Sequence, residues 1–204
     1  MHRSIWDTSE NRDGTSIPIE HNTQTDYLTG THTPGQTEIN NSNPYVNLTM
    51  KHTLSMLIFD VYVENYTGNA ELTKIEVANA TGKTVLFSAG TVNLQTGAIT
   101  GSTGKNQSYA HSLSRMLGTA PTGHEKTLPK FMVVPVSSVP VTGDIIINFT
   151  IDGKVYTYYV LASTVWASGT KNTYTVKLSG KALITSNITI TNWTDGINGN
   201  ITLP

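Results

Sequence analysis

The chain reads NTYTVKLSGKALITSNITITNWTDG over residues 172–196, and this stretch decides the fold class. Apolar and polar residues alternate along it, with a pause at Ser179 and Gly180. Alternation with a period of two is typical of a β-strand that has one face on a core and the other in water. The apolar residues predicted to face the core are Tyr174, Val176, Leu178, Ile184, Ile188 and Ile190.

Threonine takes the surface positions that charged residues usually hold. It accounts for roughly one residue in six, whereas charged residues make up 13% of the 204 residues, about half the share usual for a soluble domain. Threonine is β-branched, so it favours strands while presenting a hydroxyl to water. The formal net charge of −1 argues against binding to nucleic acid or to an anionic membrane surface.

Two further features of the composition exclude classes of site. There is no cysteine, which excludes disulfides, thiolate metal sites and cysteine nucleophiles. No segment has the apolar length needed to span a bilayer, so we expect no membrane span. Residues 1–14 contain no apolar run, and we therefore expect no signal peptide, lipobox or membrane anchor within this chain.

Residues 1–44 differ in composition from the rest of the chain, because they are rich in Asn, Asp, Thr, Gly and Pro. Two short strands are expected there, one in SIPIE at 16–20 and one that begins in DYLTG at 26–30. Residues 29–44 offer turn residues and little to bury, as in a linker. We therefore predict an N-terminal stretch with the remnant strands of a preceding domain (1–44) and a C-terminal β-sandwich domain (45–204).

The sequence after residue 45 predicts an all-β fold, an antiparallel β-sandwich of roughly eight to ten strands. The clearest unit is a hairpin within residues 143–162, whose Asp152-Gly153 pair is a type I′ turn signal. In residues 45–63 alternate side chains predict one buried face, and near Phe59 both faces become apolar, as in a central strand or at a bulge. The residues on that predicted face are Val46, Leu48, Met50, Leu54, Met56 and Ile58.

Three segments are less regular. Strict parity breaks within ELTKIEVAN at 71–79, so its register is not settled by the pattern. Pro135 restricts the strand at 130–139 to a sheet edge or a bulge. The segment 101–127 leaves room for one short helix, because Tyr109, Leu113 and Met116 have helical spacing.

No set of catalytic or metal-binding residues fits a known pattern. GSTGKN at 101–106 departs from the phosphate-binding loop at two positions, and a turn explains it better. The six histidines lack the close spacing of zinc sites, and Ser168 lacks the glycine that a nucleophile elbow requires before it. Asp144 and Asp152 lie at opposite ends of one strand, about 25 Å apart, which is too far for a glycosidase pair. We predict no enzymatic activity, no metal and no cofactor.

His52 interrupts the apolar face between Met50 and Leu54. An inward histidine could act as a ligand or a base, but no carboxylate neighbours it in the sequence. We predict a buried structural histidine whose hydrogen bonds go to the backbone.

Tyr156 and Tyr158 lie on one face of the strand predicted in KVYTYYV at 154–160. Two rings at this spacing could stack on a sugar, which makes the pair a candidate ligand platform. Packing against neighbouring strands is the simpler interpretation, because aromatic residues in sheets usually serve that purpose.

Residues 165–196 resemble the C-terminal end of the Bacteroidetes fimbrillin-like (Mfa-like) family. Members share a strand of the pattern aGk-x-Y-x-Y-x-v-x-L and a last strand that ends in D/N-W-x-D/x-G. The matching residues are Gly169, Lys171, Tyr174, Val176, Leu178, Asn192, Trp193, Asp195 and Gly196, with Thr173 near a usual tyrosine. Residues 46–61 are similar to the first strand of the family's C-terminal domain, with His52 and Leu54 in its H-x-L element. Residues 149–160 are similar to the family's dGk hairpin.

The resemblance implies an exported structural or adhesion protein at the cell surface or outer membrane. It implies a fimbrial subunit, or a fragment of one, in a stalk, tip or anchor position. Other fimbrial subunits would be partners through strand addition, a host glycan or protein would be the adhesion target, and no catalytic residue is implied. A family member usually has a complete N-terminal sandwich, whereas residues 1–44 offer at most its last strands.

Two points stay open. The alternative function is a non-catalytic carbohydrate-binding module of the bacterial surface, with Tyr156 and Tyr158 as its platform. Residues 197–204 alternate briefly, which fits either a strand added to a neighbouring subunit or a simple terminus. Trp193 has the opposite parity to the isoleucines before it, so we expect it to cap the edge of the sandwich.

Overall fold

The computed structural model describes residues 16–20, 25–32, 40–94, 96–102, 108–121, 128–180 and 182–193. For residues 20, 31–32 and 182–188 the description covers the backbone alone. This part of the chain contains strands and no helix, and hence no helix long and apolar enough to cross a membrane.

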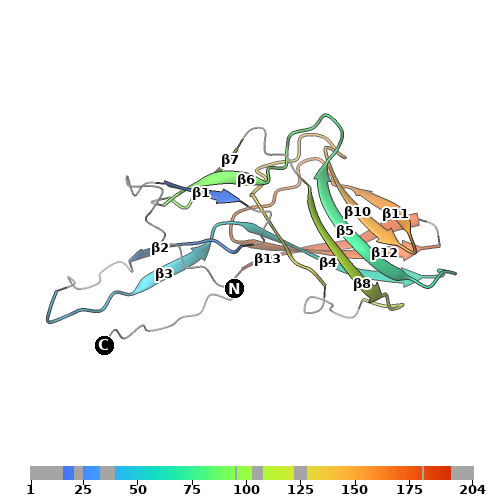
Figure 1. Ribbon diagram of the computed structural model, residues 1–204, viewed down its shortest axis with the longest axis horizontal. Helices are drawn as coiled ribbons and strands as arrows, with labels where there is room; N and C mark the ends of the chain where they lie inside the picture. The colour runs from blue at the N-terminus through green and yellow to red at the C-terminus, as the bar shows by residue number, and fades with distance from the viewer. Residues whose placement is uncertain are drawn as a thin grey trace.

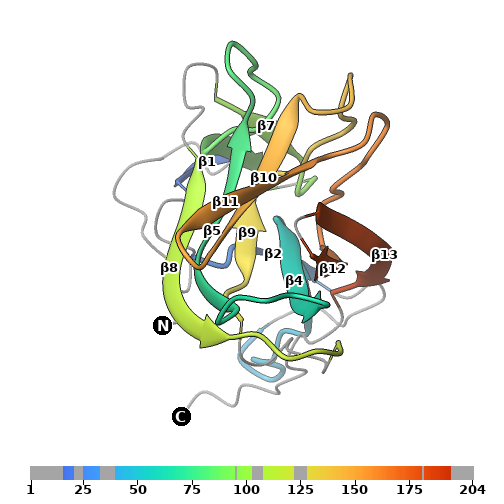
Figure 2. The ribbon, with the colours of Figure 1, turned by 90° about the vertical axis from the view of Figure 1, so that its right-hand side faces the viewer.

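Two four-stranded sheets form the sandwich (Figures 1 and 2). One sheet has the order β11-β10-β5-β8, and its strands are β5 (Glu71–Asn79), β8 (Tyr109–Met116), β10 (Ile145–Ile151) and β11 (Lys154–Tyr159). The other has the order β13-β12-β4-β9, with β4 (Ser55–Glu64), β9 (Phe131–Val133), β12 (Thr170–Ser179) and β13 (Ala182–Asn192). Strands β4 and β12 pair in parallel, and the other described strand pairs are antiparallel.

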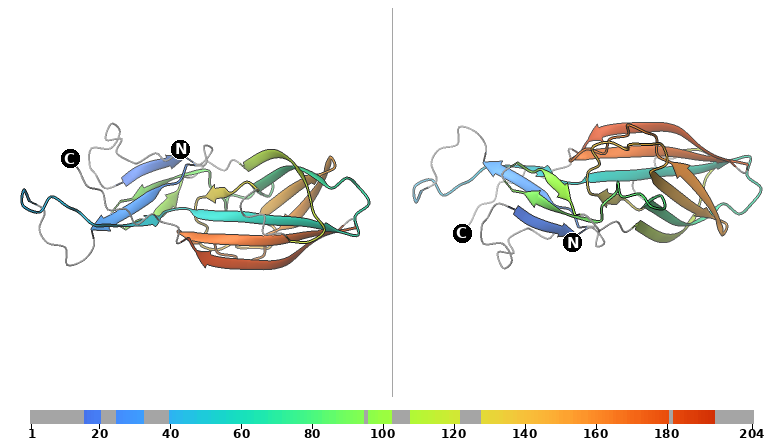
Figure 3. Two further views of the ribbon diagram at one scale, coloured as in Figure 1. Left: turned by 90° about the horizontal axis from the view of Figure 1, so that it is seen from below. Right: turned by 90° about the horizontal axis from the view of Figure 1, so that it is seen from above.

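Two smaller sheets lie at the other end of the molecule (Figures 1 and 3). The first has the order β1-β6-β7, with β1 (Ser16–Glu20), β6 (Ala89–Asn93) and β7 (Ile99–Gly101). The second pairs β2 (Leu28–His32) with β3 (Leu48–His52). Eleven described strands therefore follow residue 45, slightly more than the pattern predicted, because β7 and β9 are only three residues long.

The main core lies between the two four-stranded sheets and centres on Phe59. The rings of Phe131, Phe149 and Tyr174 lie 5.5–5.6 Å from its ring, centroid to centroid. Residues 55–61 of β4 are all buried, so both faces of this strand are covered, and it has a neighbour on each side in its sheet, β12 and β9. This confirms the central strand that the sequence predicted.

A second, smaller core joins the N-terminal strands to the rest of the chain. Ile19 on β1 is buried together with Leu54, Val92 and Val134, which all come from beyond residue 44. Packing and strand pairing therefore cross the predicted domain boundary. The boundary itself stays a prediction.

Local signals for turns and bulges are confirmed. Asp152 and Gly153 both have positive φ, +48° and +74°, as a type I′ turn requires. The broken parity of β5 is a bulge at Thr73, which both neighbouring strands skip in their register. Strand β9 is an edge strand and ends before Pro135.

The short helix considered for residues 109–116 is wrong, because this segment is strand β8. Tyr109 and Leu113 are four residues apart, a spacing that fits a helix and also an alternating strand. Pairing with β5 selects the strand, because the backbone groups on that side of β8 then bond to a neighbouring strand.

Part of the face predicted for residues 46–58 is also wrong. Leu54, Met56 and Ile58 are buried as expected. The exposed members are Val46 (48%), Leu48 (49%) and Met50 (44%). Leu48 and Met50 lie on the two-stranded ladder β2–β3 and Val46 just before it, and this ladder extends away from the sandwich, so alternation continues there without a core to face (Figure 3).

Ile190 was predicted to face the core but is 60% exposed. It lies opposite Asn172 at the start of β12, whereas the main core on that strand begins at Tyr174. Ile190 is therefore on the edge strand, past the end of the core. The side chains of Ile184 and Ile188 lie outside the described residues.

Candidate functional site

The outward side chains of one sheet form a continuous line across three strands. Strand pairing places Asn148 on β10 opposite Thr157 on β11 and opposite Glu76 on β5. Residues directly opposite each other in a sheet share a face and can interact. Because Ile147 and Phe149 point inward as part of the core, Asn148 and its partners point outward.

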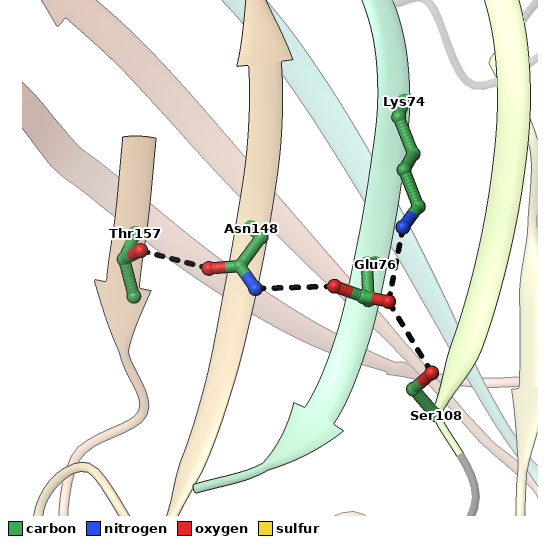
Figure 4. Close-up of polar contacts among 5 residues, drawn as sticks. All are labelled: Lys74, Glu76, Ser108, Asn148 and Thr157. Carbon is green, nitrogen blue, oxygen red and sulfur yellow. Dashed lines mark hydrogen bonds and ion pairs between the residues drawn. The ribbon is translucent and has the colours of Figure 1, made fainter. Parts of the chain in front are cut away.

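Five side chains on this face are linked by hydrogen bonds, and we call them the polar row (Figure 4). Thr157 Oγ1 donates to Asn148 Oδ1 at 2.7 Å, and Asn148 Nδ2 donates to Glu76 Oε2 at 3.2 Å. The second carboxylate oxygen, Glu76 Oε1, accepts from Lys74 Nζ at 3.1 Å and from Ser108 Oγ at 3.3 Å. The row is thus a directed chain of donors that ends on one carboxylate.

The carboxyl group of Glu76 is held in its charged form. Burial acts to raise its pKa, but hydrogen bonds from Lys74 and Asn148 outweigh burial and leave the pKa below its ordinary value. The Lys74 and Glu76 side chains are 42% and 24% exposed, so their ion pair contributes little to stability. The charges cancel, and the polar row is a neutral surface.

An exposed aromatic ring lies next to the polar row. Tyr159 is two residues beyond Thr157 on β11, so both side chains are on the outer face. Its register partner is Ile146, and 59% of Tyr159 is exposed. Alternation along the strand already placed Tyr159 and Tyr158 on opposite faces. Which of the two faces is exposed depends on where the second sheet packs, and the strand's own sequence does not specify this.

Tyr156 and Tyr158, the pair singled out in the sequence, have the opposite orientation. Both are partly buried and pack against the main core. The ring of Tyr158 lies 6.1 Å from that of Tyr174 in an edge-on arrangement. This is the packing that the simpler interpretation described, and ligand binding by the pair stays a prediction.

His52 lies at the junction of β3 and β4 in a second polar cluster. Its Nδ1 donates to the Asp26 carboxylate, whose two oxygens are 3.0 and 3.1 Å away. Its ring stacks on Trp193, and its Nε2 is buried without a hydrogen-bond partner among the described residues. His52 as a whole is half-buried, and its side chain is 9% exposed, close to the predicted burial, but the predicted backbone bonding is wrong. Antiparallel pairing of β2 with β3 brings a carboxylate from 26 residues away.

Three other candidates have structural contacts. Asp144 forms an ion pair with Lys83 at 2.9 Å. Asp152 accepts hydrogen bonds from the hydroxyl of Tyr66 and from two backbone N–H groups. Ser168 donates to the backbone carbonyl of Thr53 at 2.8 Å.

The described residues include no group of three or more His, Asp or Glu that could hold a metal ion. The loop GSTGKN lies mostly outside the described residues, as do His2, His21 and His124. His111 packs edge-on against Phe131, with ring centroids 5.0 Å apart.

Comparison with known proteins points to one family. A model of the fimbrillin-like family matches residues 8–193. Comparison with curated protein sequences gives no match.

Several solved structures share the fold. A proposed cell adhesion protein from Bacteroides uniformis has a TM-score of 0.65 and 18% identity, covering 91% of this chain and 69% of that one. A fimbrial protein from Bacteroides vulgatus has a TM-score of 0.59 and 17% identity, covering 88% and 68%. A proposed cell adhesion protein from Bacteroides ovatus has a TM-score of 0.52 and 13% identity, covering 83% and 62%. This chain therefore spans about two thirds of the length of these relatives.

Proposed function

The chain belongs to the fimbrillin-like family, and on that premise we propose that it is a non-enzymatic structural subunit of a fimbria on the surface of a bacterial cell. The family model spans most of the chain, which supports the proposal. Solved proteins with the same fold include a fimbrial protein and proposed cell adhesion proteins from Bacteroides. A position in the cell-surface fibre follows from this role.

The observation that carries the proposal is the exposed ladder β2–β3. Among the described strands β3 pairs only with β2, so no described strand bonds to the backbone donors and acceptors on its other edge. Leu48 and Met50 are each close to half exposed on this strand, and Val46 precedes it in the same state. An apolar strand with an open edge is the structure that an added strand from another subunit completes. We infer that assembly uses this ladder.

The absence of cysteine makes a clean crosslinking test available. The full chain with Leu48→Cys is labelled with benzophenone-maleimide and irradiated on cells that display fimbriae. A covalent ladder of subunits is expected, because residue 48 would contact a neighbour. The matched control is Val155→Cys, which is 61% exposed on the sandwich. Equal crosslinking from both positions, or none from residue 48, contradicts assembly through the ladder.

The surface location is tested separately. Antibody against the chain should label intact cells, and external protease should remove that label. Labelling that appears only after the cells are lysed contradicts the proposed location, whatever the crosslinking shows.

A further inference from the structure

We propose that the outer face of the sheet β11-β10-β5-β8 binds a neutral glycan, with Tyr159 as the stacking platform and the polar row as the hydroxyl-binding part. Glycan binding is a function additional to assembly into a fibre. It rests on the proposed function in one respect, the location at the cell surface where this face would meet glycans.

The ring of Tyr159 has the support that a platform needs. Gly143 lies beneath it, since a Cβ added to this glycine would be 3.1 Å from Tyr159 Cδ1. Gly143 also has a φ of +89°, a conformation that favours glycine. The ring therefore rests on backbone and leaves most of its surface to solvent. An exposed, pre-oriented aromatic ring offers apolar area at low entropic cost.

The spacing of the face fits one sugar ring next to a row of hydrogen-bonding groups. Tyr159 and Thr157 are two residues apart on β11, which places them about 7 Å apart along the strand. A pyranose stacked on Tyr159 would therefore extend its hydroxyls over Thr157 and Asn148. One hydrogen bond to Glu76 and one from Thr157 hold Asn148 in place, so its orientation is set before a ligand arrives.

The donors and acceptors on this face suit hydroxyl groups. The Lys74 ammonium has three N–H donors, and its bond to Glu76 uses one of them. The Thr157 hydroxyl gives its proton to Asn148 and presents its oxygen as an acceptor. A sugar hydroxyl can both donate and accept, so it can bond to either group.

The charge of the face selects the class of glycan. Lys74 and Glu76 neutralise each other at 3.1 Å, so the row presents no net charge to a ligand. A sialylated or sulfated glycan would gain no net attraction, because its charge would meet Lys74 and Glu76 together. The face is therefore complementary to an uncharged polyol.

The binding test uses the full chain and defined probes. Methyl glycosides of glucose, galactose and mannose are titrated into ¹⁵N-labelled protein, and an array of neutral oligosaccharides is screened in parallel. Saturable binding of at least one neutral probe is expected, with shifts at β10 and β11. Tyr159→Ala should weaken it about two- to tenfold, the loss of one stacking contact. Thr157→Val should also weaken glycan binding, because it removes the hydroxyl while keeping nearly the same side-chain shape.

Tyr45→Ala is the matched control, because Tyr45 is 54% exposed outside this sheet and its loss should leave the affinity unchanged. Melting temperatures of all variants show that each remains folded. Binding of no neutral probe, binding of acidic probes alone, or an affinity unaffected by Tyr159→Ala overturns the proposal. None of these results bears on crosslinking through residue 48, so failure here is distinct from failure of the fimbrial role.

Discussion

The imidazole ring of His52 lies flat against the indole ring of Trp193, with centroids 3.7 Å apart and planes 1° apart. Trp193 follows the last strand of the sandwich, and its backbone N–H donates to the Gly169 carbonyl at 2.9 Å. His52 also holds the Asp26 carboxylate ahead of β2. The stack therefore ties the end of β13 to the base of the ladder β2–β3, and capping of the sandwich edge by Trp193 stays a prediction.

Removing this contact should destabilise the fold. We expect His52→Ala to lower the free energy of unfolding by about 1–3 kcal/mol, because the Asp26 carboxylate loses its partner. Urea denaturation measures the change. Lys51→Ala, at the exposed neighbouring position, should stay within about 0.5 kcal/mol. A double-mutant cycle with Trp193→Ala should give a coupling of about 0.5–1.5 kcal/mol, and strictly additive effects would contradict the stack in solution.

The buried hydrogen bond between Trp166 and Tyr174 gives a second prediction. Trp166 Nε1 donates to the Tyr174 hydroxyl at 2.7 Å, and both side chains are fully buried. Tyr174→Phe should lower the free energy of unfolding by about 1–3 kcal/mol, because the indole N–H is left without an acceptor. Tyr159→Phe removes an exposed hydroxyl and serves as the control. Equal stability of the two variants in denaturant melts would argue against the bond.

Two buried tyrosines, one of them Tyr174, predict how the free energy of unfolding changes at alkaline pH. Burial raises the pKa values of Tyr109 and Tyr174 above those of exposed tyrosines. Above pH of about 10 the unfolded chain loses these protons while the folded chain keeps them. Stability is therefore fully present below that pH and falls as the pH rises, by about 1.4 kcal/mol per pH unit for each tyrosine. Tyr174→Phe should show a shallower decline, and a slope equal to that of the wild type would refute this origin.

The hydrogen bonds of the Asp152 carboxylate predict how the stability of the fold changes at acid pH. Its carboxylate accepts from the backbone N–H of Glu71 at 2.9 Å, then from that of Ala70 and from the Tyr66 hydroxyl. These bonds, led by the one from Glu71, hold the pKa of Asp152 below its ordinary value. The stability that they contribute is present above the unfolded pKa of about 3.9 and is lost as pH falls through the folded value.

Asp152→Asn isolates this effect, since asparagine also tolerates positive φ. The wild type should melt at a higher temperature than the variant at pH 7, and the difference should shrink toward pH 2. A difference in melting temperature that does not change with pH would assign the effect to the turn geometry instead of the charge.

Ile19 tests whether the first strand belongs to the same cooperative unit. Its side chain is 1% exposed and packs with Leu54, Val92 and Val134. Ile19→Ala should lower the free energy of unfolding by about 2–5 kcal/mol in a single transition. Ile190→Ala, at a 60% exposed position, is the matched control. An unchanged main transition in the Ile19 variant would support a separate N-terminal unit that ends near residue 44.

The polar row was only partly predictable from sequence. Asn148 lies between Ile147 and Phe149 in the predicted hairpin, whereas the broken parity of residues 71–79 left the side on which Glu76 lies unsettled. The hydrogen bond between Asn148 and Glu76 depends on how β10 and β5 are aligned, although the two residues are 72 apart in the chain. The bulge at Thr73 shifts that alignment. No local pattern specifies such a pairing. The carboxylate beside His52 was missed for the same reason.

The sequence by itself determined most elements and their local geometry: strands from the period of two, the hairpin from Asp152-Gly153, and an edge position or a bulge from Pro135. Tertiary structure decided which face of each strand is covered. The same alternation buries Leu54 and leaves Leu48 exposed, because a second layer lies over one and not the other. Period and turn chemistry act over a few residues, whereas burial depends on what lies across the sheet, often far away in the chain.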